Sequence, residues 1–126
     1  MNSNLKAKIR AELFRRALAG DFPTYEEFYE RASGKKMKGR FPWQTHFDAI
    51  AKEERKLGYP DITFIVKSKA SNYPSQIDFR SAKPIPNAAQ LRSLCKGTDK
   101  VIALYCPPGT PNPYWSVSAS SHDIIK

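Results

Sequence analysis

The side chains of this sequence that are best suited to binding chemistry lie between residues 35 and 46. The segment holds four cations, Lys35, Lys36, Lys38 and Arg40, followed by three polar side chains, Gln44, Thr45 and His46. Lysine and arginine contact phosphates through charge, whereas glutamine and threonine can hydrogen-bond to base edges. The segment therefore predicts contact with nucleic acid. An exposed, charged loop without a ligand is the competing interpretation.

The position of the excess positive charge along the chain favours binding of an anionic partner. The 126-residue chain carries a formal charge of +9. Residues 1–30 hold five basic and five acidic side chains, residues 31–60 hold eight and three, residues 61–100 hold seven and three, and residues 101–126 hold one of each. The excess, +5 plus +4, therefore lies entirely between residues 31 and 100. Such clustering is typical of proteins that bind a polyanion, either nucleic acid or an acidic protein.

Patterns that would indicate catalysis are weak. Asp61 followed by Asp78-Phe79-Arg80 resembles the acid and acid-x-Lys arrangement of metal-dependent nucleases, but arginine stays protonated and replaces that lysine poorly. No spacing of Ser, Cys and His predicts a triad. Cys95 and Cys106 fit neither a zinc ribbon nor a redox pair, and we interpret them as reduced thiols. We expect a protein that is not an enzyme, with no catalytic residue, metal site or cofactor.

Three helices are predicted before residue 58. An apolar i, i+4 stripe that begins at Leu5 predicts a helix over residues 4–19. Thr24-Tyr25-Glu26-Glu27 has the pattern of a capping box and predicts a second helix, which ends at Ser33-Gly34. The third helix, over residues 43–57, places Gln44, Thr45 and His46 in its first turn. A helix that presents polar groups from its first turn is suited to entering the major groove of DNA.

A β-hairpin is predicted after the third helix. Residues 61–67 are rich in β-branched side chains, and residues 76–81 are expected to return as the second strand. Further nucleic-acid contacts are expected along this hairpin, from Lys67, Lys69, Asn72 and Arg80. A plain hairpin whose lysines protect its edge is the alternative.

This order of elements resembles the winged-helix DNA-binding domain of the DNA alkyltransferase-like proteins. In that family a Thr-Tyr-Gly-Glu segment starts the first helix of the motif, and Thr24-Tyr25-Glu26-Glu27 matches it here. The resemblance covers residues 22–80 at the level of pattern. The family's Pro-Cys-His-Arg nucleophile segment is missing, because Cys106 is followed by Pro107-Pro108. The resemblance therefore implies a DNA-binding architecture and not alkyl transfer.

The remainder of the chain is predicted to extend this domain. A helix should run to Lys96 with Gly97 as its stop, and the apolar run Val101–Cys106 should form a buried strand. Tyr114 and Trp115 follow a proline-rich loop and could dock a protein partner, although such aromatic residues more commonly lie in a core or an edge strand. We therefore expect a winged-helix-like domain over residues 1–82. A helix-strand extension with a polar tail, over residues 83–126, should pack on the same core.

Together these features predict an α+β fold, in which a winged helix-turn-helix-like domain of three helices and a β-hairpin wing carries the C-terminal extension. The predicted function is that of a small basic protein that binds nucleic acid, with duplex DNA favoured, as a regulator or accessory factor. The alternative is a protein-interaction or inhibitor module of the phage or plasmid type that targets a protein through its basic surface. No apolar run could span a bilayer and no secretory signal is recognisable, so a cytoplasmic location is expected.

Overall fold

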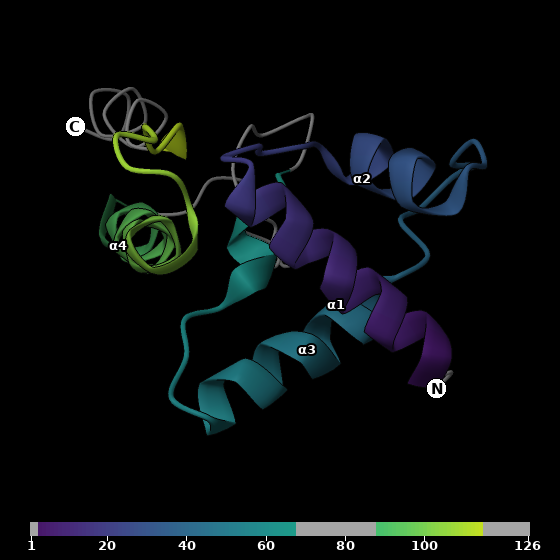
Figure 1. The fold of residues 1–126 in the computed structure, drawn as a ribbon, viewed down its shortest axis with the longest axis horizontal. Coiled ribbons are helices and arrows are strands. Elements are labelled where there is room, and N and C mark those ends of the chain that lie inside the picture. Colours follow the sequence, from purple (N-terminus) through teal and green to yellow (C-terminus); the bar gives the residue numbers. More distant parts are fainter. Residues whose placement is uncertain (1–2, 68–87, 115–126) are drawn as a thin grey trace.

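The described residues, 3–67 and 88–114 of the computed structural model, form four α-helices and one short 3₁₀ helix (Figure 1). The α-helices are α1 (Ser3–Leu18), α2 (Tyr25–Ser33), α3 (Gln44–Lys56) and α4 (Ala88–Tyr105), and the 3₁₀ helix is η1 (Ile62–Ile65). No β-strand occurs in these two ranges. Their one β-type pairing is an isolated parallel bridge between Thr24 and Lys67.

The centre of the helical packing is η1. It contacts α1, α3 and α4, and it lies between α1 and α4 in Figure 1. Ile62, Ile65 and Val66 are fully buried there. The Asp61 carboxylate begins the turn, because it accepts hydrogen bonds from the Thr63 N–H (2.9 Å) and the Thr63 hydroxyl (2.5 Å). Burying three apolar side chains on one short turn joins three helices into one core.

The predicted strand over residues 61–67 is therefore wrong. A short apolar run has the same composition in a buried strand and in a buried helical turn, so periodicity does not separate them. Here the hydrogen bonds run within the segment, from the Val66 N–H to the Thr63 carbonyl (3.1 Å) and from the Phe64 N–H to the Asp61 carbonyl (3.2 Å).

Without that strand, the predicted α+β fold with a β-hairpin wing is contradicted, because the described part of the chain is helical. The predicted second strand, residues 76–81, lies outside the described residues. So does the predicted domain boundary at residues 82 and 83.

The first two predicted helices are confirmed. The helix predicted over residues 4–19 is α1, whose Ile9, Leu13 and Ala17 are fully buried. The capping box of α2 is present, because the Glu27 N–H donates to Thr24 Oγ1 (3.2 Å) and the Thr24 N–H donates to Glu27 Oε1 (2.9 Å). A capping box is local in sequence, which is why the sequence could predict it.

The C-terminal prediction needs two corrections, since α4 continues through Gly97 and covers the segment predicted as a strand, Val101–Cys106, as far as Tyr105. Gly97 is not a helix stop. A Cβ atom at this position would lie 2.5 Å from Cε2 of Phe64 in η1, so glycine is needed for close packing. Val101, one turn later, is fully buried and belongs to the same core cluster as Ile62.

Tyr114 closes the described C-terminal segment by packing inward. It is 1% exposed, and its ring makes an edge contact with Phe22 at a centroid distance of 5.9 Å. Its N–H donates to Oδ1 of Asn112, whose amide nitrogen donates to the Cys95 carbonyl and to Asp99 (both 2.9 Å). Tyr114 is therefore a core residue, the more common of its two predicted roles, and it is not exposed for docking. Trp115 lies outside the described residues.

Candidate nucleic-acid interface

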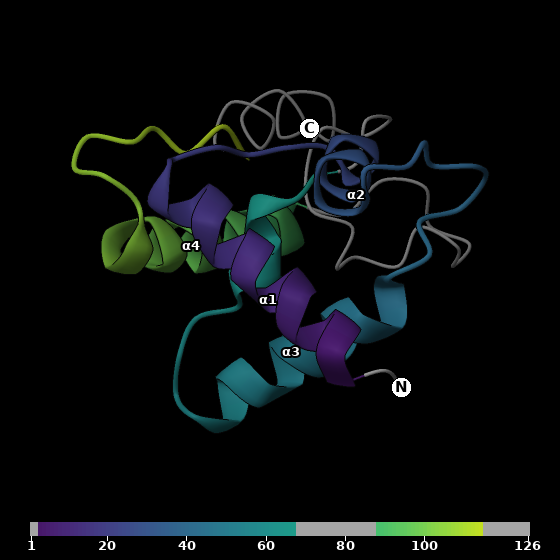
Figure 2. The same ribbon diagram turned by 45° about the vertical axis from the view of Figure 1, so that its right-hand side comes forward.

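The loop between α2 and α3, residues 34–43, is the basic loop. It begins at Gly34, whose left-handed backbone (φ +73°) ends α2. Near its middle, the Met37 N–H donates to a carboxylate oxygen of Glu30 (3.1 Å). The loop lies on the side of the molecule away from α4 in both views (Figures 1 and 2). The hydrogen bond to Glu30 ties the middle of the loop back to α2.

Aromatic side chains anchor the end of the basic loop that leads into α3. The ring of Phe41 packs against Tyr25 and Phe47, at centroid distances of 4.8 and 4.9 Å. Trp43, which is buried, packs against Tyr29 at 4.7 Å and makes an edge contact with Phe28. Edge and tilted contacts between aromatic rings add stability beyond what the burial of their apolar area contributes. The loop is thus fixed to both helices that it joins.

The four cations of the basic loop project into solvent. Lys35, Lys36, Lys38 and Arg40 are all exposed, and no carboxylate of residues 3–67 and 88–114 lies within ion-pair distance of them. Unpaired cations on one loop create a local positive potential that is available to an anionic ligand.

The cations of α1 behave differently, because several are paired with carboxylates. Arg10 bonds to Glu53 and to the buried Glu54 of α3, and Lys6 bonds to Glu53 (2.6 Å). The hydrogen bonds from Lys6 and Arg10 lower the pKa of Glu53 against the opposing effect of its burial. These side chains join α1 to α3 and leave less free charge on α1 for a ligand.

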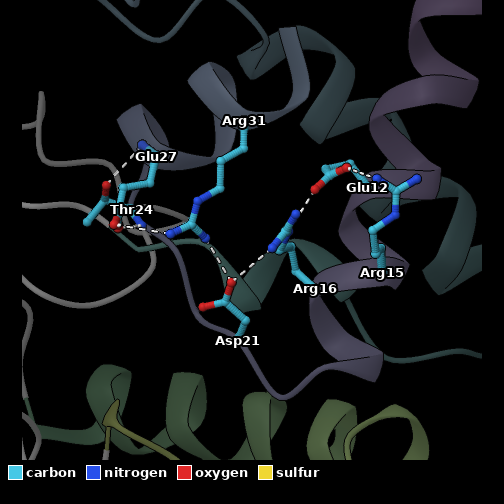
Figure 3. A network of polar contacts seen from close by, with 7 residues as sticks. All are labelled: Glu12, Arg15, Arg16, Asp21, Thr24, Glu27 and Arg31. Atoms are coloured by element: carbon cyan, nitrogen blue, oxygen red, sulfur yellow. Dashed lines mark hydrogen bonds and ion pairs between the residues drawn. The ribbon is translucent and has the colours of Figure 1, made fainter. Parts of the chain in front are cut away.

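A second network joins α1 to α2 (Figure 3). The buried Glu12 carboxylate accepts from Arg15 (2.9 Å) and Arg16 (2.7 Å), and Arg16 also reaches Asp21 (3.3 Å). Arg31 of α2 donates to the same Asp21 oxygen at 2.9 Å. The hydrogen bond to Glu12 raises the pKa of Arg16. This network has a structural role, so Arg15, Arg16 and Arg31 have less charge available for a ligand than the four cations of the basic loop.

A hollow of about 480 Å³ opens between α2 and the basic loop. Its lining residues are Tyr29, Lys35, Lys36, Lys38 and Pro42. Three lysines thus line one depression together with Tyr29 and Pro42. We call this depression the Tyr29 hollow. Tyr29 was not among the predicted contact residues, because no local pattern in the sequence indicates that the loop would fold beside it.

The first turn of α3 contains Gln44, Thr45 and His46, as predicted, but their availability differs. The Gln44 amide nitrogen donates to Oδ1 of Asp48 (2.9 Å). His46 is half-buried, and its Nδ1 is buried with no hydrogen-bond partner among the described residues. Thr45 is exposed. An exposed carboxylate at Asp48 would repel phosphates, so this turn is less suited to reading bases than its sequence indicates.

The other predicted contact residues lie apart from the basic loop or outside the described residues. The Lys67 backbone pairs with the start of α2, through its N–H to the Pro23 carbonyl (3.0 Å) and its carbonyl from the Tyr25 N–H (3.1 Å). The Lys67 charge also acts on Glu27 and contributes to the lowered pKa of that carboxyl, which hydrogen bonding from the Thr24 N–H chiefly causes. Lys69, Asn72 and Arg80 are not among the described residues.

Comparison of the chain with protein-family models, with curated proteins and with solved structures gave no match. The resemblance to the DNA alkyltransferase-like proteins therefore remains a prediction as to family, while its hairpin wing is contradicted. Residues 3–67 and 88–114 contain no group of three or more His, Cys, Asp and Glu side chains placed to hold a metal ion. Over the same ranges, no helix combines the length and the apolar character needed to cross a membrane.

Proposed function

We propose that this protein binds nucleic acid through the basic loop, with Lys35, Lys36, Lys38 and Arg40 contacting backbone phosphates. The supporting observation is that these four exposed cations have no carboxylate partner among the described residues, whereas Lys6, Arg10 and Arg16 are paired. Phosphate contacts of this kind supply most of the affinity of non-specific nucleic-acid binding and release counterions. In this proposal the protein acts in the cytoplasm as a regulator or accessory factor.

The binding should depend little on sequence. The Gln44 amide is already bonded to Asp48, and the β-hairpin that was expected to supply further contacts is contradicted. Phosphate contacts orient a protein on nucleic acid but carry no base information. We therefore assign the affinity to the basic loop and give α3 a supporting role.

The test is the salt dependence of binding, measured by fluorescence anisotropy with labelled duplex and single-stranded oligonucleotides. Four phosphate contacts should weaken the affinity by roughly 50- to 150-fold between about 50 and 200 mM salt, because each contact releases condensed counterions. Replacing the four loop cations with alanine should lower the affinity for all sequences alike and flatten this dependence.

A matched control removes the same charge from other surfaces. Lys8, Lys56, Lys96 and Lys100 are exposed, and replacing these four with alanine gives the same net charge as the loop variant. The control should keep most of the affinity and salt dependence of the unmodified protein. Equal losses in the two variants would show that net charge, not the loop, governs binding. Absence of binding to either probe at low salt would contradict the proposal and favour an acidic protein as partner.

A further inference from the structure

We propose that the Tyr29 hollow receives one unstacked base, so that the preferred ligand is a single-stranded nucleic acid. This inference rests on the proposed function and names its substrate class. The hollow combines the two groups that a nucleotide requires, a surface for the base and cations for the flanking phosphates. Its volume of about 480 Å³ lies in the range of pockets that hold small organic ligands.

The aromatic wall of the hollow is held in position before any ligand arrives. Tyr29 is half-buried on α2, and its ring packs against Trp43 at 4.7 Å with an interplanar angle of 59°. Trp43 in turn contacts Phe28 and Phe41, so the ring is supported by the core. A side chain that is already fixed loses little freedom when a base packs on it. Every base has a π-face, so such a contact tolerates many sequences.

The charged wall fits the backbone on either side of that base. Lys35, Lys36 and Lys38 line the hollow together with the exposed Pro42, and no described carboxylate lines it. Successive lysines along a loop can follow phosphates that are separated by one nucleotide. Cations that track the backbone beside an aromatic platform are the usual arrangement for binding single strands.

A duplex cannot easily place a base in the Tyr29 hollow. Each base in a duplex is paired and stacked, and reaching a hollow would require it to be flipped out at a cost of unpairing and unstacking. A single strand avoids most of that cost. The basic loop should therefore bind both forms through phosphates, and the Tyr29 hollow should add affinity for the single strand alone.

The experiment compares three labelled probes of equal length on the full chain at one salt concentration. The probes are oligothymidylate, a duplex, and an oligomer in which every base is replaced by an abasic residue. Oligothymidylate should bind about 5- to 100-fold more tightly than the abasic oligomer, because base stacking on an aromatic side chain contributes affinity of this order. The abasic comparison requires no substitution in the protein and so does not depend on the folding of a variant.

Substitution of Tyr29 provides the second measurement. Tyr29→Leu should lower the affinity for oligothymidylate about 5- to 100-fold while changing the affinities for the duplex and the abasic oligomer less than about twofold. Tyr29→Phe keeps the ring and should retain single-strand binding. Circular dichroism and thermal unfolding of both variants establish that the fold is intact.

The outcomes separate this inference from the proposed function. If the three probes bind equally and the variant without the loop cations binds none of them, the base-binding role of Tyr29 is overturned and the proposed function stands. If none of the three probes binds, both the proposed function and this inference are overturned. Tighter binding to the duplex than to oligothymidylate would overturn the assignment to single strands alone.

Discussion

At the scale of single residues, Asp61 decides the conformation of the segment that follows it. Burial raises the pKa of its carboxyl group, and the two hydrogen bonds from Thr63 oppose the rise. Because the folded-state pKa is raised, the stability that the protonated carboxyl contributes is complete below its ordinary value of 3.8. That contribution is lost as the pH rises through the raised value. Above the raised pKa, burial of the ionised carboxylate therefore opposes folding even though the carboxylate caps η1.

This balance predicts the effect of two substitutions. Asp61→Asn keeps an oxygen that can accept from the Thr63 N–H and removes the buried charge, so at pH 7 its unfolding free energy should stay within about 1 kcal/mol of the unmodified protein. Asp61→Ala removes both hydrogen bonds that the carboxylate accepts from Thr63 and should cost about 1–3 kcal/mol. Denaturant unfolding at neutral and acidic pH measures both values.

The pH dependence provides the control for Asp61. The unmodified protein should gain stability relative to Asp61→Asn as the pH falls toward 3.8, because only the carboxyl group can take up a proton. If Asp61→Asn is as unstable as Asp61→Ala at neutral pH, the charge itself is required and the assigned role of burial is wrong.

At the scale of single residues, part of the candidate site could be predicted from the sequence. The sequence located the four cations of the basic loop, because charge and flanking glycines are visible in a linear chain. It could not show that the Gln44 amide bonds to Asp48, nor that Tyr29 lines a hollow with three lysines. Those features depend on how a loop folds back over a helix, and no periodicity in the sequence encodes that.

At the scale of secondary structure, α2 begins with a capping box whose stability should depend on pH. The Thr24 N–H bonds to the Glu27 carboxylate and chiefly accounts for the lowered pKa of that group. A carboxyl group with a lowered folded-state pKa contributes stability above its ordinary value of 4.5 and loses it as the pH falls through the folded value. The cap should therefore be strongest at neutral pH.

Thr24→Ala should lower the unfolding free energy by about 1 kcal/mol at pH 7, as is typical for the loss of an N-cap side chain. Glu27→Gln should destabilise at pH 7 and have a smaller effect well below pH 4.5, where the carboxyl is protonated. Glu26→Gln is the control, because Glu26 lies in the same first turn but outside the capping pair. Equal effects of Glu26→Gln and Glu27→Gln at both pH values would assign the stabilisation to the helix dipole and not to the cap.

Elements whose signals are local were predicted well, and those set by distant contacts were not. The N-terminal stripe and the capping box lie within one or two turns of chain, so α1 and α2 were predicted near their observed bounds. The residues of η1 and the second half of α4 are apolar runs without a distinctive period. Whether such a run becomes a strand or a helical turn depends on what surrounds it. Here η1 contacts α1, α3 and α4, and the N–H groups of Thr63, Phe64 and Val66 bond within the segment.

At the scale of the whole molecule, the contact between η1 and α4 joins the C-terminal helix to the core. Phe64 of η1 lies against Gly97 of α4, where a Cβ atom would approach its ring edge to 2.5 Å. Glycine in a helix normally lowers stability by about 1 kcal/mol relative to alanine. Its presence here is explained by the close approach of the two elements and by the volume of the Phe64 ring.

We predict that Gly97→Ala lowers the unfolding free energy when Phe64 is present and raises it when the Phe64 ring is removed. Gly97→Ala alone should destabilise the protein by about 1–3 kcal/mol, because the added methyl group overpacks the contact by more than the helix gains. In a Phe64→Ala background the same change should stabilise by about 0.5–1 kcal/mol, since the ring is gone and helix propensity remains. Lys96→Ala, an exposed neighbour on α4, should change stability by less than about 0.5 kcal/mol in either background. Denaturant unfolding of the four combinations at positions 64 and 97 gives the coupling energy directly. If Gly97→Ala were stabilising in both backgrounds, Phe64 would not restrict this position, and the glycine would need another explanation.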